Sequence, residues 1–229
     1  MFPPDLAFEV PPYRLSGRVY GALLNQRAAL EALGEAVHHP PYRAPPKAPV
    51  LYVKPLNTLA VDGAAVAVPT DAAELEVGAT LGIVLGRTAC RVTAVEALDR
   101  VAGYVIVADL CIPHTSFYRP SVRLRARDGF CPIGPRVVPR EAVPDPDALA
   151  VQVSLDGVVR QSTTTAGMIR PVAQLVADVS AFMTLAPGDV LLLGVAAGAP
   201  RARAGQRAAI AIDGLGMLRF ALVAEGESP

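Results

Sequence analysis

Two continuous apolar runs in the middle of the chain have the pattern of strands that are buried on both faces. The first run, Ala79–Leu85, lies between Gly78 and Gly86, and the second begins at Val101 and stops at Asp109. Such β-branched and aromatic runs favour strands that are covered on both sides. An unpaired carboxylate at the end of a buried strand is costly, so Asp109 should face a polar cleft, a cation or backbone N–H groups.

The remaining pattern predicts several shorter elements. Apolar runs predict strands at Val19–Leu24, Leu51–Val53, Ala64–Val68 and Val190–Leu193. Apolar residues at helical spacing predict helices at Ala28–Val37 and Met168–Met183, and the capping-box spacing of Thr93 and Glu96 predicts a third helix that ends near Arg100. Two Asp-Gly pairs, at 156–157 and 213–214, each separate two strand-like segments and predict hairpins. The prolines of His39–Pro49 exclude a helix or a central strand there.

These elements indicate the fold class. Strands outnumber helices and no regular alternation of strand and helix is present, so we expect a β-rich α+β protein, a folded mixed sheet with a few peripheral helices. The 229 residues suffice for one substantial domain that buries roughly 70% of its surface on folding. We therefore expect an irregular, proline-containing lead-in over residues 1–17, followed by a single domain over residues 18–229.

Composition excludes several classes of protein. The chain has 21 basic and 21 acidic residues, so its net charge gives no reason to expect nucleic acid or an anionic membrane as partner. No apolar run approaches the roughly 20 residues of a membrane span, and the N-terminus lacks the layout of a signal peptide. Cys90, Cys111 and Cys131 are an odd number at wide spacing, which is typical of reduced thiols and predicts a cytoplasmic protein.

Candidate binding residues follow Asp109. If the segment after it is extended, the alternating residues Arg123, Arg125 and Arg127 share one face. Guanidinium groups pair bidentately with carboxylates, which would suit a substrate with two or three carboxylates, although surface or subunit contacts explain the arginines equally well. We take Arg125, Arg123, Tyr118 and Lys54 as candidate substrate-binding residues.

A nucleophile–base pair is a weaker hypothesis. His114 lies near Cys111 and Cys131 in the sequence, and a thiol beside an imidazole is a common nucleophilic arrangement. Dispersed cysteines are more often buried as small apolar side chains. The sequence therefore assigns no catalytic residue.

Several motifs resemble one known family. Gly103-Tyr104 leading to Ala108-Asp109, FYRP at 117–120, RDGFCPIGP at 127–135 and LAPGDVLLLG at 185–194 are similar to the fumarylacetoacetate hydrolase family. The likeness spans about residues 18–223 and implies a mixed β-sheet roll. Within the family, Pro40–Thr58 resembles the N-terminal half of two-half bacterial decarboxylase/isomerases rather than their C-terminal half.

The resemblance also implies a metal site that this chain does not complete. Family members hold Mg²⁺ or Mn²⁺ with one aspartate and two glutamates one residue apart. The aspartate matches Asp109, but Gly78 and Thr80 replace the two glutamates. Other family positions fall on Ala29 for a histidine, Pro113 for an arginine, Arg125 for a lysine and Val195 for a threonine. We therefore expect no metal in this chain, with Asp109 as the only surviving ligand position.

Two alternatives concern these carboxylates. Glu74 and Glu76 have the spacing of the family's glutamate pair and could form a displaced site, although they lie four residues upstream of Gly78 and Thr80. Asp109 could instead accept N–H groups or pair with an arginine.

Three interpretations of function follow. The chain could be an N-terminal-type subunit that pairs with a homologous catalytic subunit carrying the metal, or forms a homodimer. It could be an independently active hydrolase, decarboxylase or isomerase with a rearranged site. It could also be a scaffold without activity.

Overall fold

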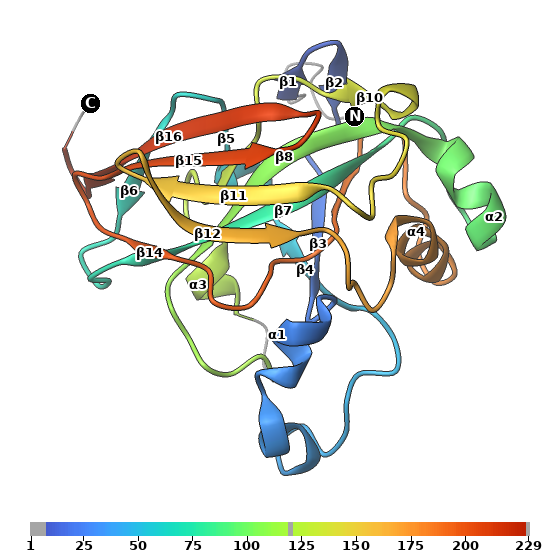
Figure 1. Cartoon of the computed structure of the whole chain (residues 1–229), viewed down its shortest axis with the longest axis horizontal. Coiled ribbons are helices and arrows are strands. Elements are labelled where there is room, and N and C mark those ends of the chain that lie inside the picture. Colours follow the sequence, from blue (N-terminus) through green and yellow to red (C-terminus); the bar gives the residue numbers. More distant parts are fainter. Residues whose placement is uncertain (1–7, 119–120, 228–229) are drawn as a thin grey trace.

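A computed structural model, which describes residues 8–118 and 121–227, contains two large β-sheets that pack against each other (Figure 1). The larger sheet has the order β10 (Val138–Pro139), β8 (Val101–Cys111), β7 (Leu75–Leu85), β13 (Val190–Leu192), β3 (Val19–Leu23) and β4 (Val50–Lys54), and β14 (Arg201–Ala202) also pairs with β7. The second sheet has the order β12 (Val158–Thr164), β11 (Ala150–Leu155), β15 (Arg207–Ile212), β16 (Gly216–Ala224) and β6 (Ala65–Val68). Both are mixed sheets, because β13 pairs with β3 in parallel and β16 with β6 in parallel.

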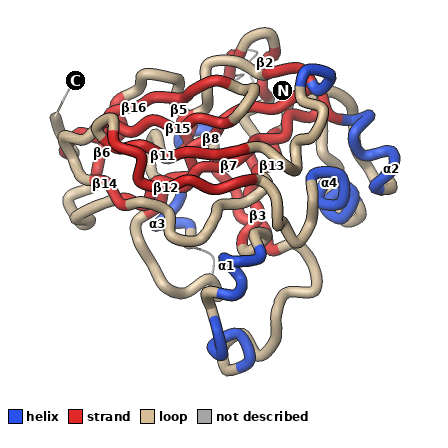
Figure 2. The backbone as a smooth tube through the Cα atoms, in the orientation of Figure 1, coloured by secondary structure: helices blue, strands red, loops and turns tan. Residues whose placement is uncertain are grey.

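Two small sheets and short helices complete the described part of the chain (Figure 2). The small sheets pair β1 (Phe8–Val10) with β2 (Tyr13–Leu15) and β5 (Leu59–Ala60) with β9 (Cys131–Pro132). The α-helices are α1 (Arg27–Glu31), α2 (Ala94–Ala97), α3 (Val122–Arg125) and α4 (Val172–Ser180). Four 3-10 helices lie at Gly34–His38, Leu56–Thr58, Leu98–Arg100 and Arg140–Ala142. The expected β-rich α+β roll is therefore confirmed, and no helix among the described residues is long and apolar enough to cross a membrane.

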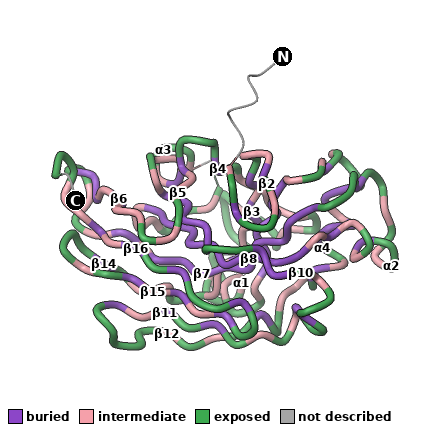
Figure 3. Tube along the Cα trace, turned by 90° about the horizontal axis from the view of Figure 1, so that it is seen from above, coloured by how far each residue is buried: buried purple, intermediate pink, exposed green. Residues whose placement is uncertain are grey.

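The central strands β7 and β8 are buried on both faces, as their apolar runs predict (Figure 3). One face carries alternating side chains such as Leu81, Ile83 and Ile106, which pack against β11, β15 and β16 in the main core. The other face carries Val105 and Val107, which lie in a second apolar cluster with residues of β1, β2 and β13. Because neither face meets solvent, any polar side chain on these strands must find a partner inside the protein.

Most predicted elements are present, with shifted boundaries. The hairpins β11–β12 and β15–β16 form at the two Asp-Gly pairs, and Asp156 and Gly157 both have positive φ, which a tight hairpin turn requires. The capping box of Thr93 and Glu96 is formed as predicted. The helix expected over Met168–Met183 is shorter, because Pro171 stands at the N-cap and α4 begins at Val172.

Three expectations were wrong in detail. Part of the lead-in is regular, because β1 and β2 form a hairpin whose residues Val10 and Leu15 are buried. The helix expected over Ala28–Val37 is broken into α1 and a 3-10 helix, with Gly34 at positive φ between them. Strand β8 does not stop at Asp109 but continues to Cys111, so this carboxylate lies inside a strand.

Candidate functional site

Asp109 lies on the face of β8 that carries Val105 and Val107, at the end where this face becomes polar. Its direct partner on β7 is Gly78, and the neighbouring pairs are Glu76 with Cys111 and Thr80 with Val107. Alternate residues of paired strands share a face. The two central strands therefore bring the side chains of residues 76, 80, 109 and 111 to one region.

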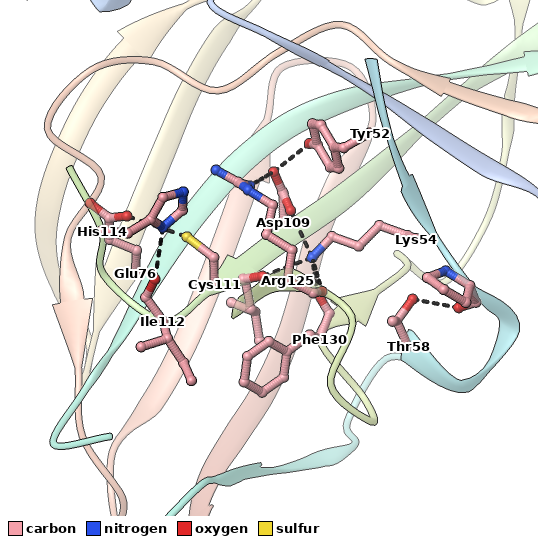
Figure 4. Close-up of polar contacts among 12 residues, drawn as sticks. Tyr52, Lys54, Thr58, Glu76, Asp109, Cys111, Ile112, His114, Arg125 and Phe130 are labelled. Atoms are coloured by element: carbon pink, nitrogen blue, oxygen red, sulfur yellow. Dashed lines mark hydrogen bonds and ion pairs between the residues drawn. The ribbon is translucent and has the colours of Figure 1, made fainter. Parts of the chain in front are cut away.

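Both carboxylate oxygens of Asp109 meet donors (Figure 4). The Oδ1 atom forms an ion pair of 2.8 Å with the ammonium of Lys54. The Oδ2 atom accepts hydrogen bonds from Arg125 Nη1 at 2.9 Å and from the hydroxyl of Tyr52. Asp109 is only 2% exposed, so two cations and a phenol stabilise a carboxylate that is almost fully buried.

Lys54 is buried as deeply as the carboxylate that it contacts. Its Nζ atom donates to the main-chain carbonyls of Leu110, Arg125 and Phe130 at 2.7, 3.0 and 2.9 Å. Three carbonyls match the three N–H groups of an ammonium. Lys54 therefore joins β4, β8 and the segment after α3, and it contacts Asp109 from behind rather than from the cavity described below.

Arg125 has spare donor capacity. Its guanidinium lies 4.9 Å from the centre of the Tyr52 ring and pairs with Asp109 through Nη1. The Nε atom is buried without a hydrogen-bond partner. Part of the hydrogen-bonding capacity of this guanidinium is therefore unused within the described structure. An unsatisfied buried donor of this kind costs about 1–3 kcal/mol.

Electrostatics keep the cluster charged. Burial alone would raise the pKa of Asp109, but Lys54 and Arg125 outweigh it and hold that pKa below its usual value. Burial lowers the pKa of Arg125, yet the Asp109 carboxylate raises it further, so the pKa is raised overall. The pKa of Tyr52 is well above its usual value because of burial and the Asp109 charge, so its hydroxyl stays protonated and can donate.

The buried cysteines do not form a nucleophilic site. Burial raises the pKa of Cys111 to about 12 and that of Cys131 to about 12. Cys111 Sγ donates to Glu76 Oε2 at 3.3 Å, and the Nδ1 atom of His114 contacts the carbonyl of Ile112 instead of a thiol. Both thiols are thus protonated near neutral pH, which argues against the nucleophile–base hypothesis.

A cavity of about 340 Å³ lies in front of Asp109 and Arg125. The strands β7 and β8 supply Glu76, Gly78, Asp109 and Cys111, and Tyr52 adds part of one wall. The other walls come from the segments that end strands β3, β8 and β13, with mostly small or apolar side chains: Ala22, Leu23, Leu24, Ala29, Ala32, Leu33, Thr115, Phe117, Val195, Ala196, Ala197, Gly198 and Ala199. The arrangement resembles a small-molecule site, an apolar hollow with few polar groups.

The residues around Gly78 do not fit a divalent cation. A Cβ atom at Gly78 would lie 2.8 Å from the Asp109 carbonyl and 2.9 Å from both methyl groups of Val195. The Thr80 hydroxyl accepts the N–H of Gly194 at 3.1 Å. Among the described residues no group of three histidine, cysteine or acidic side chains could hold a metal ion, and both oxygens of Asp109 already face cations or a phenol. Mg²⁺ and Mn²⁺ prefer several oxygen ligands, which this site does not offer.

The displaced glutamate pair also finds no support in the geometry. Glu76 lines the cavity, whereas Glu74 forms ion pairs with Arg201 and Arg203 outside it. The two glutamates therefore do not converge on one point.

The arginines that the sequence grouped together do not act together. The segment is not extended, because α3 covers Val122–Arg125, so the assumption of one shared face was wrong. Arg125 turns inward, while Arg123 and Arg127 both donate to Asp71 at the surface. Tyr118 is 56% exposed and does not line the cavity. Of the four predicted binding residues, the structure brings Arg125 to the cavity and places Lys54 behind it. Arg119, in the FYRP motif, lies outside the described residues.

Sequence reasoning missed Tyr52. It is two residues before Lys54 on β4, so the same strand face carries both side chains, and that spacing was the available signal. Its ring lies over Gly21 on the neighbouring strand, where an added Cβ would meet ring atoms at 2.0–2.5 Å. Gly21 thus gives Tyr52 the space to reach Asp109.

Comparison with known proteins gives a consistent family. The model of the fumarylacetoacetate (FAA) hydrolase C-terminal family matches residues 18–223. A 4-hydroxyphenylacetate degradation bifunctional isomerase/decarboxylase of Salmonella dublin is 38% identical over 93% of this chain and 48% of its own length. The chain spans about half the length of such curated relatives.

Solved structures show the same fold. A 2-hydroxyhepta-2,4-diene-1,7-dioate isomerase from Mycobacterium marinum is 28% identical, with a TM-score of 0.76 over 93% of this chain and 77% of that one. A fumarylpyruvate hydrolase from Pseudomonas aeruginosa, solved with Mn²⁺ and pyruvate, is 25% identical, with a TM-score of 0.83 over 98% of this chain and 99% of that one.

Proposed function

Because this chain belongs to the fumarylacetoacetate hydrolase family, we propose that it is an N-terminal-type subunit of a decarboxylase/isomerase in the breakdown of 4-hydroxyphenylacetate through homoprotocatechuate. The complete enzyme would decarboxylate 5-oxopent-3-ene-1,2,5-tricarboxylate and isomerise 2-hydroxyhepta-2,4-diene-1,7-dioate. Both steps form an enolate, whose charge a divalent cation can stabilise. In this proposal the cation belongs to a homologous catalytic subunit.

One observation carries the proposal. The chain is 35–38% identical to bifunctional relatives over 93% of its own length, yet it covers only 48–49% of theirs. We infer that the chain corresponds to one half of such a relative. The misfit of a metal at Gly78 and Thr80 supports the assignment of catalysis to the other half.

This chain would then contribute a folded domain and an anion-binding cavity rather than the metal. Arg125 can hold a carboxylate of the substrate or line the cleft of the assembled enzyme. We further propose that this enzyme is cytoplasmic, in keeping with the free cysteines Cys90, Cys111 and Cys131.

The test is co-expression with a homologue that carries the intact Glu-x-Glu pair. We expect a stoichiometric complex, metal in the complex but not in this chain alone, and turnover of the tricarboxylate that is higher in the complex than in the homologue alone. Absence of a complex, or a homologue that is fully active and stable alone, would contradict the proposal.

A second candidate is an independently active family enzyme. It is favoured by the fumarylpyruvate hydrolase structure, which this chain matches over 99% of that chain, so one domain of this size makes up that whole structure. Stoichiometric Mn²⁺ or Mg²⁺ on the isolated chain together with turnover would support this candidate and exclude the first.

A further inference from the structure

The charged side chains at the cavity form a set whose charges cancel. Among the described residues, the charged groups that line the cavity are Glu76, Asp109 and Arg125, and Lys54 reaches Asp109 from behind. Two cations therefore accompany two carboxylates, and the four side chains together carry no net charge. The other walls are mostly small or apolar, so an additional ion would bring a charge that nothing in the cavity compensates.

The two central strands place both carboxylates on one face. Glu76 pairs with Cys111 and Gly78 pairs with Asp109, so Glu76 and Asp109 are diagonal neighbours on β7 and β8. Diagonal neighbours on antiparallel strands lie about 7–8 Å apart, and long side chains can reach across that distance. Two carboxylates this close repel each other, and a cation near both removes the repulsion. This face of the sheet therefore favours a bound positive charge.

The guanidinium of Arg125 supplies that charge. Its Nη1 atom lies 2.9 Å from Asp109 Oδ2, and in the view of Figure 4 it lies between Asp109 on one side and Cys111 and Glu76 on the other. Burial lowers the pKa of Arg125, but the carboxylates of Asp109 and Glu76 both raise it, so both act on this guanidinium. The ring of Tyr52, 4.9 Å away, adds a cation–π contact. Two carboxylates and an aromatic face are the surroundings that a bound organic cation prefers.

The main chain holds this cation in place. The carbonyl of Arg125 accepts the ammonium of Lys54 at 3.0 Å, and the carbonyl of Leu124 accepts the N–H of Ile112 at 2.9 Å. The helical turn that carries Arg125 is thus fixed to β4 and to the end of β8. A cation that is tethered in this way has a high effective concentration at its site and does not depend on the concentration of any ion in solution.

We propose that Arg125 is a built-in counter-ion, whose guanidinium fills a cation site formed by Asp109 and Glu76, so that the cavity needs no cation from solution. Because Arg125 and both carboxylates line the cavity, shortening the arginine opens its place to small solutes. One positive charge then restores neutrality beside Lys54, so a guanidinium-type cation should bind there. A divalent ion would exceed that charge by one, and the described residues offer it no group of three histidine, cysteine or acidic ligands.

Chemical rescue of Arg125→Ala tests the proposal, with thermal unfolding of the full chain followed by circular dichroism. The variant should unfold at a lower temperature than the native chain. Methylguanidinium at about 20 mM, far below denaturing concentrations, should raise its midpoint by about 3–5 °C. N-methylurea, which has a similar shape but no charge, should leave the midpoint unchanged. If Arg125→Ala is unfolded in buffer, the same titration should restore its circular dichroism signal.

Three further variants test the arithmetic of the charges. Arg123→Ala is the matched control on the same helix; the side chain of Arg123 is 80% exposed, so methylguanidinium should not shift the midpoint of this variant. Arg125→Lys keeps the charge and should respond to methylguanidinium less than Arg125→Ala does. In Arg125→Ala combined with Glu76→Gln, Lys54 balances Asp109 alone, so most of the shift should be lost.

The native chain provides the last measurement. Its unfolding midpoint should be the same in EDTA and in millimolar Mg²⁺ or Mn²⁺, because its own side chain supplies the cation. No rescue of Arg125→Ala by methylguanidinium, equal rescue by N-methylurea, or a native midpoint that falls in EDTA would overturn the proposal. The inference goes beyond the subunit assignment and concerns the isolated chain, so its failure would leave that assignment to be decided by complex formation and turnover.

Discussion

Arg125 and Arg123 lie two residues apart on one short helix and each pairs with an aspartate, yet their surroundings are opposite. The side chain of Arg125 is 9% exposed and forms an ion pair with Asp109, whose side chain is 1% exposed. The side chain of Arg123 is 80% exposed and meets Asp71 at the surface, where Arg127 joins it. The comparison shows that the same pair of residue types forms a buried ion pair in one place and a solvated surface contact in the other.

The largest expected effect comes from removing the deepest cation. Lys54→Met should lower the free energy of unfolding by about 3–5 kcal/mol, because it leaves three main-chain carbonyls and one carboxylate oxygen without their ammonium. Urea unfolding followed by circular dichroism measures this. If Arg123→Met lowered the free energy of unfolding by as much, the distinction between the buried Asp109 cluster and the surface pair of Arg123 and Asp71 would be lost.

The next effect concerns the carboxylate itself and its response to acid. Asp109→Asn should cost about 2–3 kcal/mol at pH 7, since hydrogen bonds to charged groups are lost while the shape is kept. The native pKa of Asp109 is lowered, so its stabilisation is complete above the unfolded pKa of about 3.9 and is lost as pH falls through the lower folded pKa.

The variant should therefore lose less stability than the native chain between about pH 5 and about pH 2, a range that brackets the unfolded pKa. Urea unfolding at several pH values checks this. Asp71→Asn is the matched control at pH 7. The pKa of Asp71 is also lowered, by hydrogen bonds from Arg123 and Arg127. Because this carboxylate lies at the surface, its replacement should leave the free energy of unfolding at pH 7 nearly unchanged. If the free energy of unfolding fell equally with pH in the native chain and in Asp109→Asn, that result would contradict the charged state assigned to Asp109.

A smaller loss is expected when the family's glutamates are introduced. Gly78→Glu with Thr80→Glu should destabilise the chain by about 1–3 kcal/mol through overpacking against Val195. Adding Val195→Ala should recover part of this loss. We expect no stoichiometric Mn²⁺ in the double variant by metal analysis, because Asp109 remains paired; tight Mn²⁺ binding there would show that the cavity tolerates a metal after all.

The smallest effect belongs to the surface pair. Arg123→Gln should leave the midpoint of thermal unfolding almost unchanged in 0.15 M salt, since exposed ion pairs are screened. Differential scanning calorimetry at low and high salt measures it. A clear, salt-independent drop in the midpoint would mean that Asp71 anchors α3 more firmly than its exposure indicates.

The same contrast explains what the sequence could predict. The runs that became β7 and β8, the two Asp-Gly hairpins and the Thr93 capping box were predictable because each depends on residues close in sequence. The partners of Asp109 were not predictable in this way. Tyr52 and Arg125 reach it from β4 and α3, and alternation along the arginine segment could not reveal that a helical turn would send Arg125 inward and Arg123 outward.

The hydrogen bond between Thr80 and Gly194 has a consequence for the loop after β13. The Thr80 hydroxyl on β7 accepts the main-chain N–H of Gly194, so it fixes the start of the loop that follows β13. A side chain without a hydrogen-bond acceptor at position 80 would leave this main-chain N–H unpaired. The contact therefore ties the cavity wall formed by residues 195–199 to the central sheet.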